Sequence, residues 1–245
     1  MTTSGTTSFN LDLNNLVEEA FERCGSEIRT GYELRTARRS LNLLTAEWAN
    51  RGVNLWTIEQ GEVAMVQGQV SYELPIDTVD LLEHVIRTGT GQNQSDLTIT
   101  RISVSTYATI PNKLAQGRPI QVWVDRQSGA TYPSGGRPEG TNPSTGVDHP
   151  QIYVWPTPDQ SNYYTFVYWR MRRIQDGGNG TTTQDIPFRF LNCMVAGLAY
   201  FLSMKIAPER MEALKFQYDE QWKYAAEEDR DKSAIRFVPR RMFIE

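Results

Sequence analysis

The chain has few of the residues that usually carry chemistry, because its 245 residues include only two histidines and two cysteines. It also has no Walker loop and no G-x-G-x-x-G, H-E-x-x-H, C-x-x-C or G-x-S-x-G motif. Of the two histidines, His84 and His149, the second lies beside Asp148 in a Gly/Pro-rich stretch, a setting far more typical of a solvated loop than of a catalytic triad. We therefore predict no enzyme activity and no catalytic, cofactor-binding or metal-binding residue.

The two cysteines exclude a disulfide framework. Cys24 and Cys193 both fall on apolar faces of expected helices. Such cysteines are typical of small buried hydrophobic residues in a reducing compartment. We expect neither a disulfide nor a metal site at them.

The chain lacks an excess of basic charge and a long hydrophobic run. Its formal charge is −4, which argues against a protein that holds nucleic acid by bulk positive charge. The longest apolar run, residues 190–204, is interrupted by Asn192 and Ser203 and is too short to cross a bilayer comfortably. The first ten residues have no signal-peptide pattern, so we predict a mobile tail at 1–10 and synthesis in the cytoplasm.

Two amphipathic helices are expected near the start of the chain. The first follows an N-cap residue, Asp12, and closes at Gly25, and the second opens with a capping box at Thr30 and Glu33 and closes at Gly52. Apolar positions recur every three or four residues, at Leu13, Leu16, Val17, Ala20, Phe21 and Cys24 and then at Leu34, Ala37, Leu41, Leu44 and Trp48.

A second helical pair is predicted between Asp185 and Arg230, and we expect the rest of the fold to pack on it. Asp185 is the expected N-cap of its first helix, Pro187 lies near the first helical position, and Pro208 opens the second helix. The first helix is apolar on most faces and should be buried. The second carries one stripe, at Met211, Leu214, Tyr218, Trp222 and Ala225, and should lie at the surface.

Between the helical pairs, apolar residues recur at every second position, as they do in β-strands. Val70, Tyr72 and Leu74 alternate with polar residues and follow a strand-like run at 62–66 and a turn at 67–68, which predicts a β-hairpin. Further short strands are expected at 81–87, 97–102, 120–125, 151–155 and 163–171. Together they indicate a small sandwich or barrel-like sheet.

The predicted fold class is therefore α+β: a helical bundle formed by the N- and C-terminal helix pairs, with an inserted antiparallel β-rich domain. We assign residues 11–52 and 185–232 to the bundle and residues 53–184 to the β-rich domain. Residues 126–150 are rich in Gly, Pro, Ser and Thr and form a long loop within that domain. Residues 233–245 form a separate C-terminal docking arm.

One strand allows a nucleic-acid hypothesis, because its aromatic residues lead directly into arginines. These residues are Tyr163, Tyr164, Phe166, Tyr168 and Trp169, followed by Arg170, Arg172 and Arg173. Aromatic rings stack on bases and arginines bind phosphates. Strand alternation instead places the aromatic residues on both faces of a covered central strand, which is the stronger interpretation. A nucleic-acid-binding module and a non-catalytic cytoplasmic interaction protein stay open as alternatives.

Several segments together resemble one known family. They are LRTARRSL at 34–41, EWANRG at 47–52, LW at 55–56, VQGQVSYELP at 66–75, GRP at 117–119, WPTPD at 155–159, VAGLAY at 195–200 and APE at 207–209. With them the chain resembles the head-to-tail adaptor (connector) proteins of tailed bacteriophages, in particular the short-tailed phage type that includes the tail tubular protein A group.

This resemblance implies a structural protein of the virion neck. It implies a ring of about twelve subunits, bound to the phage portal protein on one side and to a tail nozzle or tail tube protein on the other, with tail fibres as a further partner. DNA would pass through the lumen without sequence-specific binding. The resemblance implies no cofactor, no membrane and no catalytic residue.

Two segments are the predicted contact sites. The C-terminal segment (residues 233–245) mixes apolar residues with arginines and should dock on the portal or on a neighbouring subunit, and the alternative is that it folds back on the helices of its own chain. Its predicted contact residues are Ile235, Arg236, Phe237, Val238, Arg240, Arg241 and Phe243. The long loop (residues 126–150) should meet tail components through Gly129, Tyr132 and Arg137.

Overall fold

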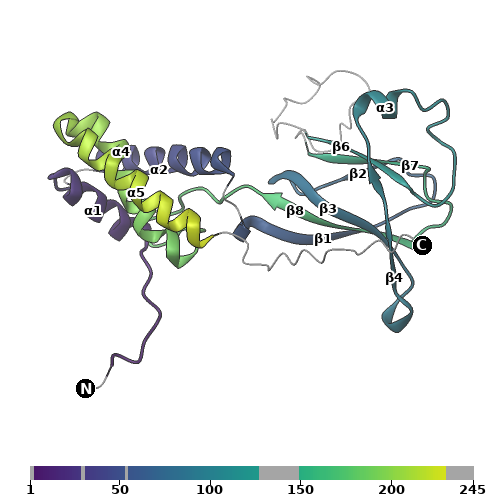
Figure 1. The fold of residues 1–245 in the computed structure, drawn as a ribbon, viewed down its shortest axis with the longest axis horizontal. Coiled ribbons are helices and arrows are strands. Elements are labelled where there is room, and N and C mark those ends of the chain that lie inside the picture. Colours follow the sequence, from purple (N-terminus) through teal and green to yellow (C-terminus); the bar gives the residue numbers. More distant parts are fainter. Residues whose placement is uncertain (1–2, 29–30, 53–54, 127–148, 230–245) are drawn as a thin grey trace, which may run out of the picture. The chain divides into compact units, whose positions relative to one another are not determined.

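The computed structural model describes residues 3–28, 31–52, 55–126 and 149–229. The chain forms two compact units, because most contacts between residues fall within one unit or the other. Figure 1 shows them as a group of helices and a group of strands. Of the described residues, 3–28, 31–52 and 175–229 belong to the helical unit, and 55–126 and 149–174 belong to the β unit. The predicted α+β class, with antiparallel sheets inserted between an N-terminal and a C-terminal helix pair, is confirmed.

The first helix forms where its end signals place it, whereas Thr30 of the capping box predicted for the second helix lies outside the described residues. Helix α1 (Leu13–Cys24) begins after Asp12, whose side chain accepts a 2.8 Å hydrogen bond from the Asn15 backbone N–H. It ends at Gly25, whose φ of 76° lies in the left-handed region that glycine adopts without strain. Helix α2 (Gly31–Arg51) buries its expected stripe, which includes Leu41 and Trp48.

The C-terminal pair is a hairpin with one buried and one superficial member, as predicted. Helix α4 (Leu191–Ile206) packs against α1, α2 and α5 (Met211–Glu228), and nearly all of its residues from Leu191 to Ala199 are buried. A Cβ atom at Gly197 would lie 2.9 Å from side-chain atoms of Leu44 and Tyr218. Glycine at this position therefore lets α2 and α5 approach α4 closely.

The helix starts in this pair are only partly as expected. Pro208 opens α5 through a short helix, η4 (Pro208–Arg210), as predicted. The N-cap predicted at Asp185 is wrong, because α4 begins at Leu191 after a short helix, η3 (Phe188–Phe190). The Asp185 carboxylate instead accepts a 3.1 Å hydrogen bond from the Gln175 backbone N–H, so it stabilises the linker that precedes the helix.

That linker belongs to the helical unit, although the sequence placed residues 175–184 with the strands. The backbone N–H groups of Leu13 and Asn14 donate 3.0 Å hydrogen bonds to the carbonyls of Thr182 and Gly180. The first backbone N–H groups of a helix have no acceptor within that helix, and carbonyl groups of the linker accept hydrogen bonds from two of them in α1. Contacts of this kind join residues that are far apart in the sequence.

The described residues of the β unit form two four-stranded sheets. One has the order β1 (Ile58–Ala64), β8 (Tyr164–Arg172), β3 (Thr78–Thr88), β4 (Ser95–Thr98), and the other has the order β2 (Ser71–Glu73), β7 (Gln151–Trp155), β6 (Gln121–Asp125), β5 (Thr100–Arg101). Neighbouring strands are antiparallel except β5 and β6. The described part of this unit also has the short helices η1 (Leu55–Thr57), η2 (Gly91–Asn93) and α3 (Val104–Ala108).

Both sheets contribute side chains to one apolar core, which is the sandwich-like arrangement that the short strands predict. Phe166 and Ile86 from the first sheet and Val122 and Ile152 from the second are fully buried in this core. Strand β8 lies between β1 and β3, so the prediction that it is a central strand is confirmed.

The hairpin predicted for residues 62–74 is wrong. The turn is present, since the Gln69 backbone N–H donates to the Val66 carbonyl at 3.1 Å and Gly68 has a φ of 72°. However, β1 pairs with β8 in one sheet and β2 pairs with β7 in the other. The turn therefore carries the chain from one sheet to the other, because pairing with distant strands replaces pairing across the turn.

Candidate interaction surfaces

All of the sequence-predicted contact residues lie outside the described residues. They are Ile235, Arg236, Phe237, Val238, Arg240, Arg241 and Phe243 in the C-terminal segment and Gly129, Tyr132 and Arg137 in the long loop. Their roles stay predictions. The structure does describe the elements that adjoin them, which are the end of α5 and the paired strands β6 and β7.

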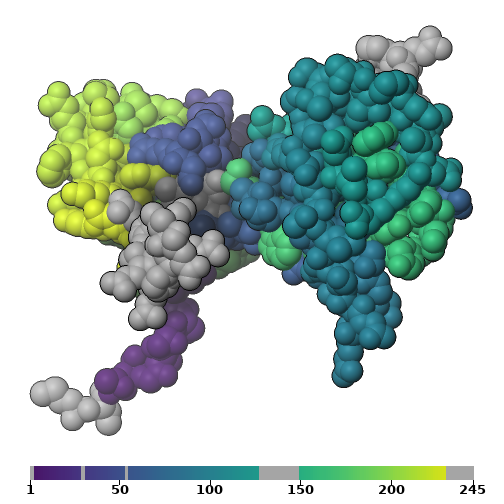
Figure 2. Space-filling view, turned by 45° about the vertical axis from the view of Figure 1, so that its right-hand side comes forward, coloured from purple at the N-terminus to yellow at the C-terminus, as the bar shows by residue number. Residues whose placement is uncertain are grey.

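A groove of about 630 Å³ runs along α1 within the helical unit, and we call it the α1 groove. Its apolar lining comes from three separate segments: Phe9 and Leu11 precede α1, Phe188 lies in η3, and Leu191 and Val195 belong to α4. Phe9 is 67% exposed and Phe188 is 72% exposed. Figure 2 shows the N-terminal residues extending away from the helical unit. The groove thus presents large apolar side chains to solvent.

The polar edge of the α1 groove is acidic. It is lined from α1 by Glu18, Glu19 and Glu22. The Glu19 carboxylate is neutralised by Arg23, whose Nε lies 2.9 Å from Glu19 Oε1. Glu18 and Glu22 are exposed and make no ion pair with any residue that the structure describes. They lie one helical turn apart on the same face. The groove therefore offers two unneutralised carboxylates beside its apolar lining.

One ion pair places the end of α5 beside this groove. Arg189, which lines the groove, donates a 2.9 Å hydrogen bond from Nε to Oδ1 of Asp229. Asp229 is the C-cap residue of α5, and its side chain is only 1% exposed. Breaking such a pair leaves a buried charge without compensation, so the contact holds the helix end in place.

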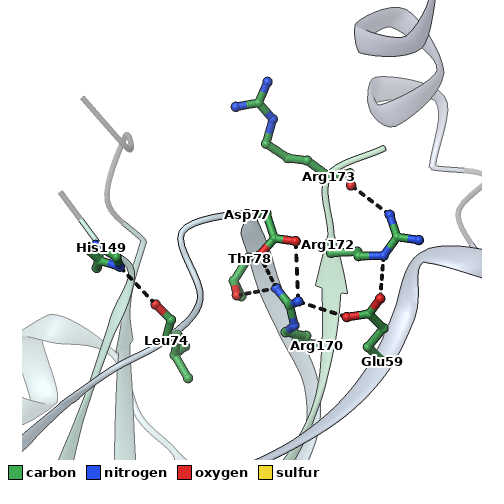
Figure 3. Close-up of polar contacts among 8 residues, drawn as sticks. All are labelled: Glu59, Leu74, Asp77, Thr78, His149, Arg170, Arg172 and Arg173. Atoms are coloured by element: carbon green, nitrogen blue, oxygen red, sulfur yellow. Dashed lines mark hydrogen bonds and ion pairs between the residues drawn. The ribbon is translucent and has the colours of Figure 1, made fainter. Parts of the chain in front are cut away.

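The strand that motivated the nucleic-acid hypothesis is occupied by other contacts. Tyr164, Phe166 and Tyr168 on β8 are buried in the core. Figure 3 shows Arg170 next to three acceptors, and its guanidinium donates to Asp77, Thr78 and Glu59. Arg172 donates to the other carboxylate oxygen of Glu59 at 2.6 Å. The buried rings are not available to stack on bases, and these two arginines already have anionic partners.

Neither histidine has a catalytic setting among the described residues. The His84 ring stacks on Phe166 with centroids 5.9 Å apart, and neither of its nitrogens has a hydrogen-bond partner in that part of the chain. Burial lowers the pKa of His84, and the nearby Arg101 lowers it further. His149 Nδ1 lies 3.4 Å from the Leu74 carbonyl oxygen (Figure 3). A general base needs an aligned nucleophile, and among the described residues neither ring is hydrogen-bonded to a nucleophilic side chain.

Both cysteines are buried, as predicted. The Cys24 thiol donates to the Ala199 carbonyl at 3.3 Å. Burial raises the pKa of Cys24 to about 11 and that of Cys193 to about 12, so both thiols stay protonated and weakly nucleophilic at neutral pH. In the described ranges no group of three or more His, Cys, Asp or Glu side chains is placed to hold a metal ion, and no helix is long and apolar enough to span a membrane.

Sequence reasoning did not find the α1 groove. Its lining residues come from the N-terminal extension, α1, η3 and α4, so no single stretch of sequence contains it. Two signals were available: Phe9 stands alone among polar residues, and Glu18 and Glu22 share one helix face. Neither signal alone predicts a groove.

A family model described as SU10 adaptor protein matches residues 12–241, which is most of the chain. No curated protein matches the sequence.

Proposed function

Because the chain belongs to the SU10 adaptor protein family of phage head–tail adaptors, we propose that about twelve copies form a ring that joins the portal to the tail. The match over residues 12–241 carries this proposal, because it spans the helical unit and the β unit together. The ring lets the genome pass from head to tail during ejection.

The physical properties of the subunit support this role. Helix α4 is enclosed by α1, α2 and α5, which gives a stiff body suited to repeated side-by-side packing. The formal charge of −4 per subunit makes the ring acidic, so it should not hold DNA tightly as the DNA slides through.

The proposed partners are the portal protein and a tail nozzle or tail tube protein, with tail fibres as a further partner. The C-terminal segment (residues 233–245) docks on the portal, since its apolar residues and arginines suit a contact that combines burial with charge pairing. The long loop meets tail components. Truncation after Lys232 should abolish binding to purified portal while the subunit stays folded, and retained binding would contradict the role of the segment.

The proposed role involves no catalysis. Among the described residues, the hydrogen-bond contact of His149 is with the Leu74 carbonyl, and burial raises the pKa of both thiols so that they stay protonated at neutral pH. A His149→Ala variant should therefore assemble tails and infect cells at near wild-type levels. A particle that assembles fully with this variant but fails to infect would show that chemistry has been missed.

The decisive test is a copy count in purified virions. Quantitative mass spectrometry against the major capsid protein should give about twelve copies per particle. One or two copies, or absence from the particle, would contradict the proposal. Size-exclusion of the purified chain, followed by micrographs with portal added, separates a ring-forming adaptor from a monomeric cytoplasmic interaction protein.

A further inference from the structure

We propose that, in the free subunit, the α1 groove binds the C-terminal segment (residues 233–245) of the same chain. This goes beyond the proposed function, since it concerns where the segment lies before a portal is present. A portal would then have to displace the segment from the groove. Three features of the described residues support the assignment: apolar surface, charge and position.

The apolar surfaces of the groove and the segment are complementary. Phe9 and Phe188 leave most of their side-chain area exposed at the groove. The segment carries six large apolar residues: Ile235, Phe237, Val238, Met242, Phe243 and Ile244. A cavity of about 630 Å³ has the size of sites that enclose a small ligand, so it has room for several of these side chains. Seating them there would remove apolar surface from water on both sides.

The charges are complementary too. The unneutralised groups at the groove edge, within the described residues, are the carboxylates of Glu18 and Glu22, since Arg23 pairs with Glu19 and Arg189 pairs with Asp229. The segment carries Arg236, Arg240 and Arg241. Arginines interspersed with apolar residues match an apolar groove with an acidic edge.

The position of α5 favours the chain's own segment over a partner. Asp229 is bonded to Arg189, which itself lines the groove, and the segment begins only four residues later. That connection spans at most about 14 Å when extended. A tether of this length gives an effective concentration in the millimolar range, so a contact too weak to hold a separate molecule is still occupied within one chain.

The test measures binding of a fluorescent peptide with the sequence of residues 230–245 by anisotropy. The groove of the wild-type chain should be occupied, whereas a full-length Phe237→Ser and Phe243→Ser variant should leave it free. We expect the variant to bind the peptide at least about tenfold more tightly than the wild type. Both substitutions lie beyond α5, and thermal melting checks that the helical unit is intact.

A matched pair of charge reversals locates the site. Added to the Phe237→Ser and Phe243→Ser variant, Glu18→Lys with Glu22→Lys should weaken peptide binding at least about tenfold at low salt. Glu62→Lys with Glu83→Lys makes the same change in net charge at exposed positions of the β unit and should alter binding by less than about twofold.

Each other outcome overturns the inference. Equal peptide affinity for wild type and variant, or no binding to either, means that the segment does not occupy the groove. Equal effects of the two charge reversals mean that the peptide binds elsewhere. If the wild type excludes the peptide only at concentrations where light scattering shows oligomers, the occupant is the segment of a second copy. All of these results are independent of the copy count in virions, so the inference and the proposed function can fail separately.

Discussion

The indole N–H of Trp48 on α2 donates a 2.9 Å hydrogen bond to the hydroxyl of Tyr218 on α5. Both side chains are essentially fully buried, with exposed fractions of 0% and 1%. This bond joins the N-terminal helix pair to the C-terminal pair inside the helical unit, and it satisfies a polar group that water cannot reach.

We predict that Tyr218→Phe destabilises the chain by about 1–3 kcal/mol, because the Trp48 N–H is left buried without an acceptor. Urea denaturation followed by circular dichroism measures the free energy of unfolding. Tyr200→Phe is the control, since Tyr200 stacks on Tyr218 but makes no comparable hydrogen bond among the described residues. A Tyr218→Phe loss no greater than that of the control would mean that Trp48 finds another acceptor.

A side chain at Gly61 in β1 is predicted to destabilise the β unit. Gly61 pairs with Tyr168 across the sheet, and a Cβ atom there would lie 2.5 Å from the Tyr168 ring, which is itself buried. Gly61→Ala should therefore cost about 1–3 kcal/mol through displacement of the packed ring. Gly31→Ala, where no atom lies within 4 Å of the new Cβ, should be neutral or slightly stabilising. Equal effects of the two variants on the melting temperature would contradict this account.

Much of the helical unit could be predicted from the sequence because helix signals are local. Asp12 and Gly25 lie next to the helix that they bound, so both ends of α1 were correct to the residue. The partners of β1 and β2 were wrong because β8 and β7 lie far away in the sequence, and alternation shows which face is buried but not which strand is adjacent.

The candidate surfaces were less predictable for the same reason. Phe9, Glu18 and Phe188 come together only through tertiary packing, so the α1 groove has no signature in any one segment. The aromatic residues of β8 illustrate the opposite case. Their pattern in the sequence is compatible with base stacking. In the folded chain, however, Phe166 is buried and Arg170 forms ion pairs, which favours a role of this strand in the core.

Replacing Arg170 with lysine should destabilise the chain moderately. The Arg170 guanidinium bridges Glu59 and Asp77 while its side chain is only 11% exposed, and a single ammonium cannot reach both carboxylates with the same geometry. The carboxylates are 44% and 42% exposed, so solvent screening limits the expected loss to about 1–2 kcal/mol for Arg170→Lys. Arg126→Lys, in a pair where the arginine is 62% exposed, should cost less than about 0.5 kcal/mol. Chemical denaturation of both variants at two salt concentrations tests the difference.

His84 should make the stability of the chain depend on pH. Because burial lowers the pKa of His84 below its ordinary value of 6.5, the unfolded chain binds a proton more readily than the folded chain. The contribution of the neutral His84 ring to the free energy of unfolding is therefore fully present above about pH 6.5. It is lost as the pH falls toward the pKa of His84 in the folded chain. His84→Phe should remove this loss and stay within about 1 kcal/mol of wild type at pH 8, where both rings are neutral. Parallel loss of melting temperature in both proteins between pH 7 and pH 5 would contradict the assignment.

The long loop should be removable without unfolding the β unit. Strands β6 and β7, which flank it, are antiparallel neighbours, with Asp125 paired to Gln151. The two ends of the loop are therefore held together by the sheet, and a shorter connection can close the same turn. Deleting residues 129–145 should change the free energy of unfolding by no more than about 1 kcal/mol, because loop-closure entropy varies only slowly with length.

The effect of this deletion should appear in assembly. If the loop contacts tail components, particles carrying the deletion should contain the adaptor in normal copy number but attach fewer tails, which negative-stain micrographs can count. Substituting Tyr132 and Arg137 with Ser in the full-length loop is the matched variant, since it keeps the loop length and removes only predicted contact side chains. Normal tail attachment in both variants would contradict the contact. Loss of cooperative thermal unfolding in the deletion alone would show that the loop belongs to the core, contrary to the prediction from its lack of an apolar pattern.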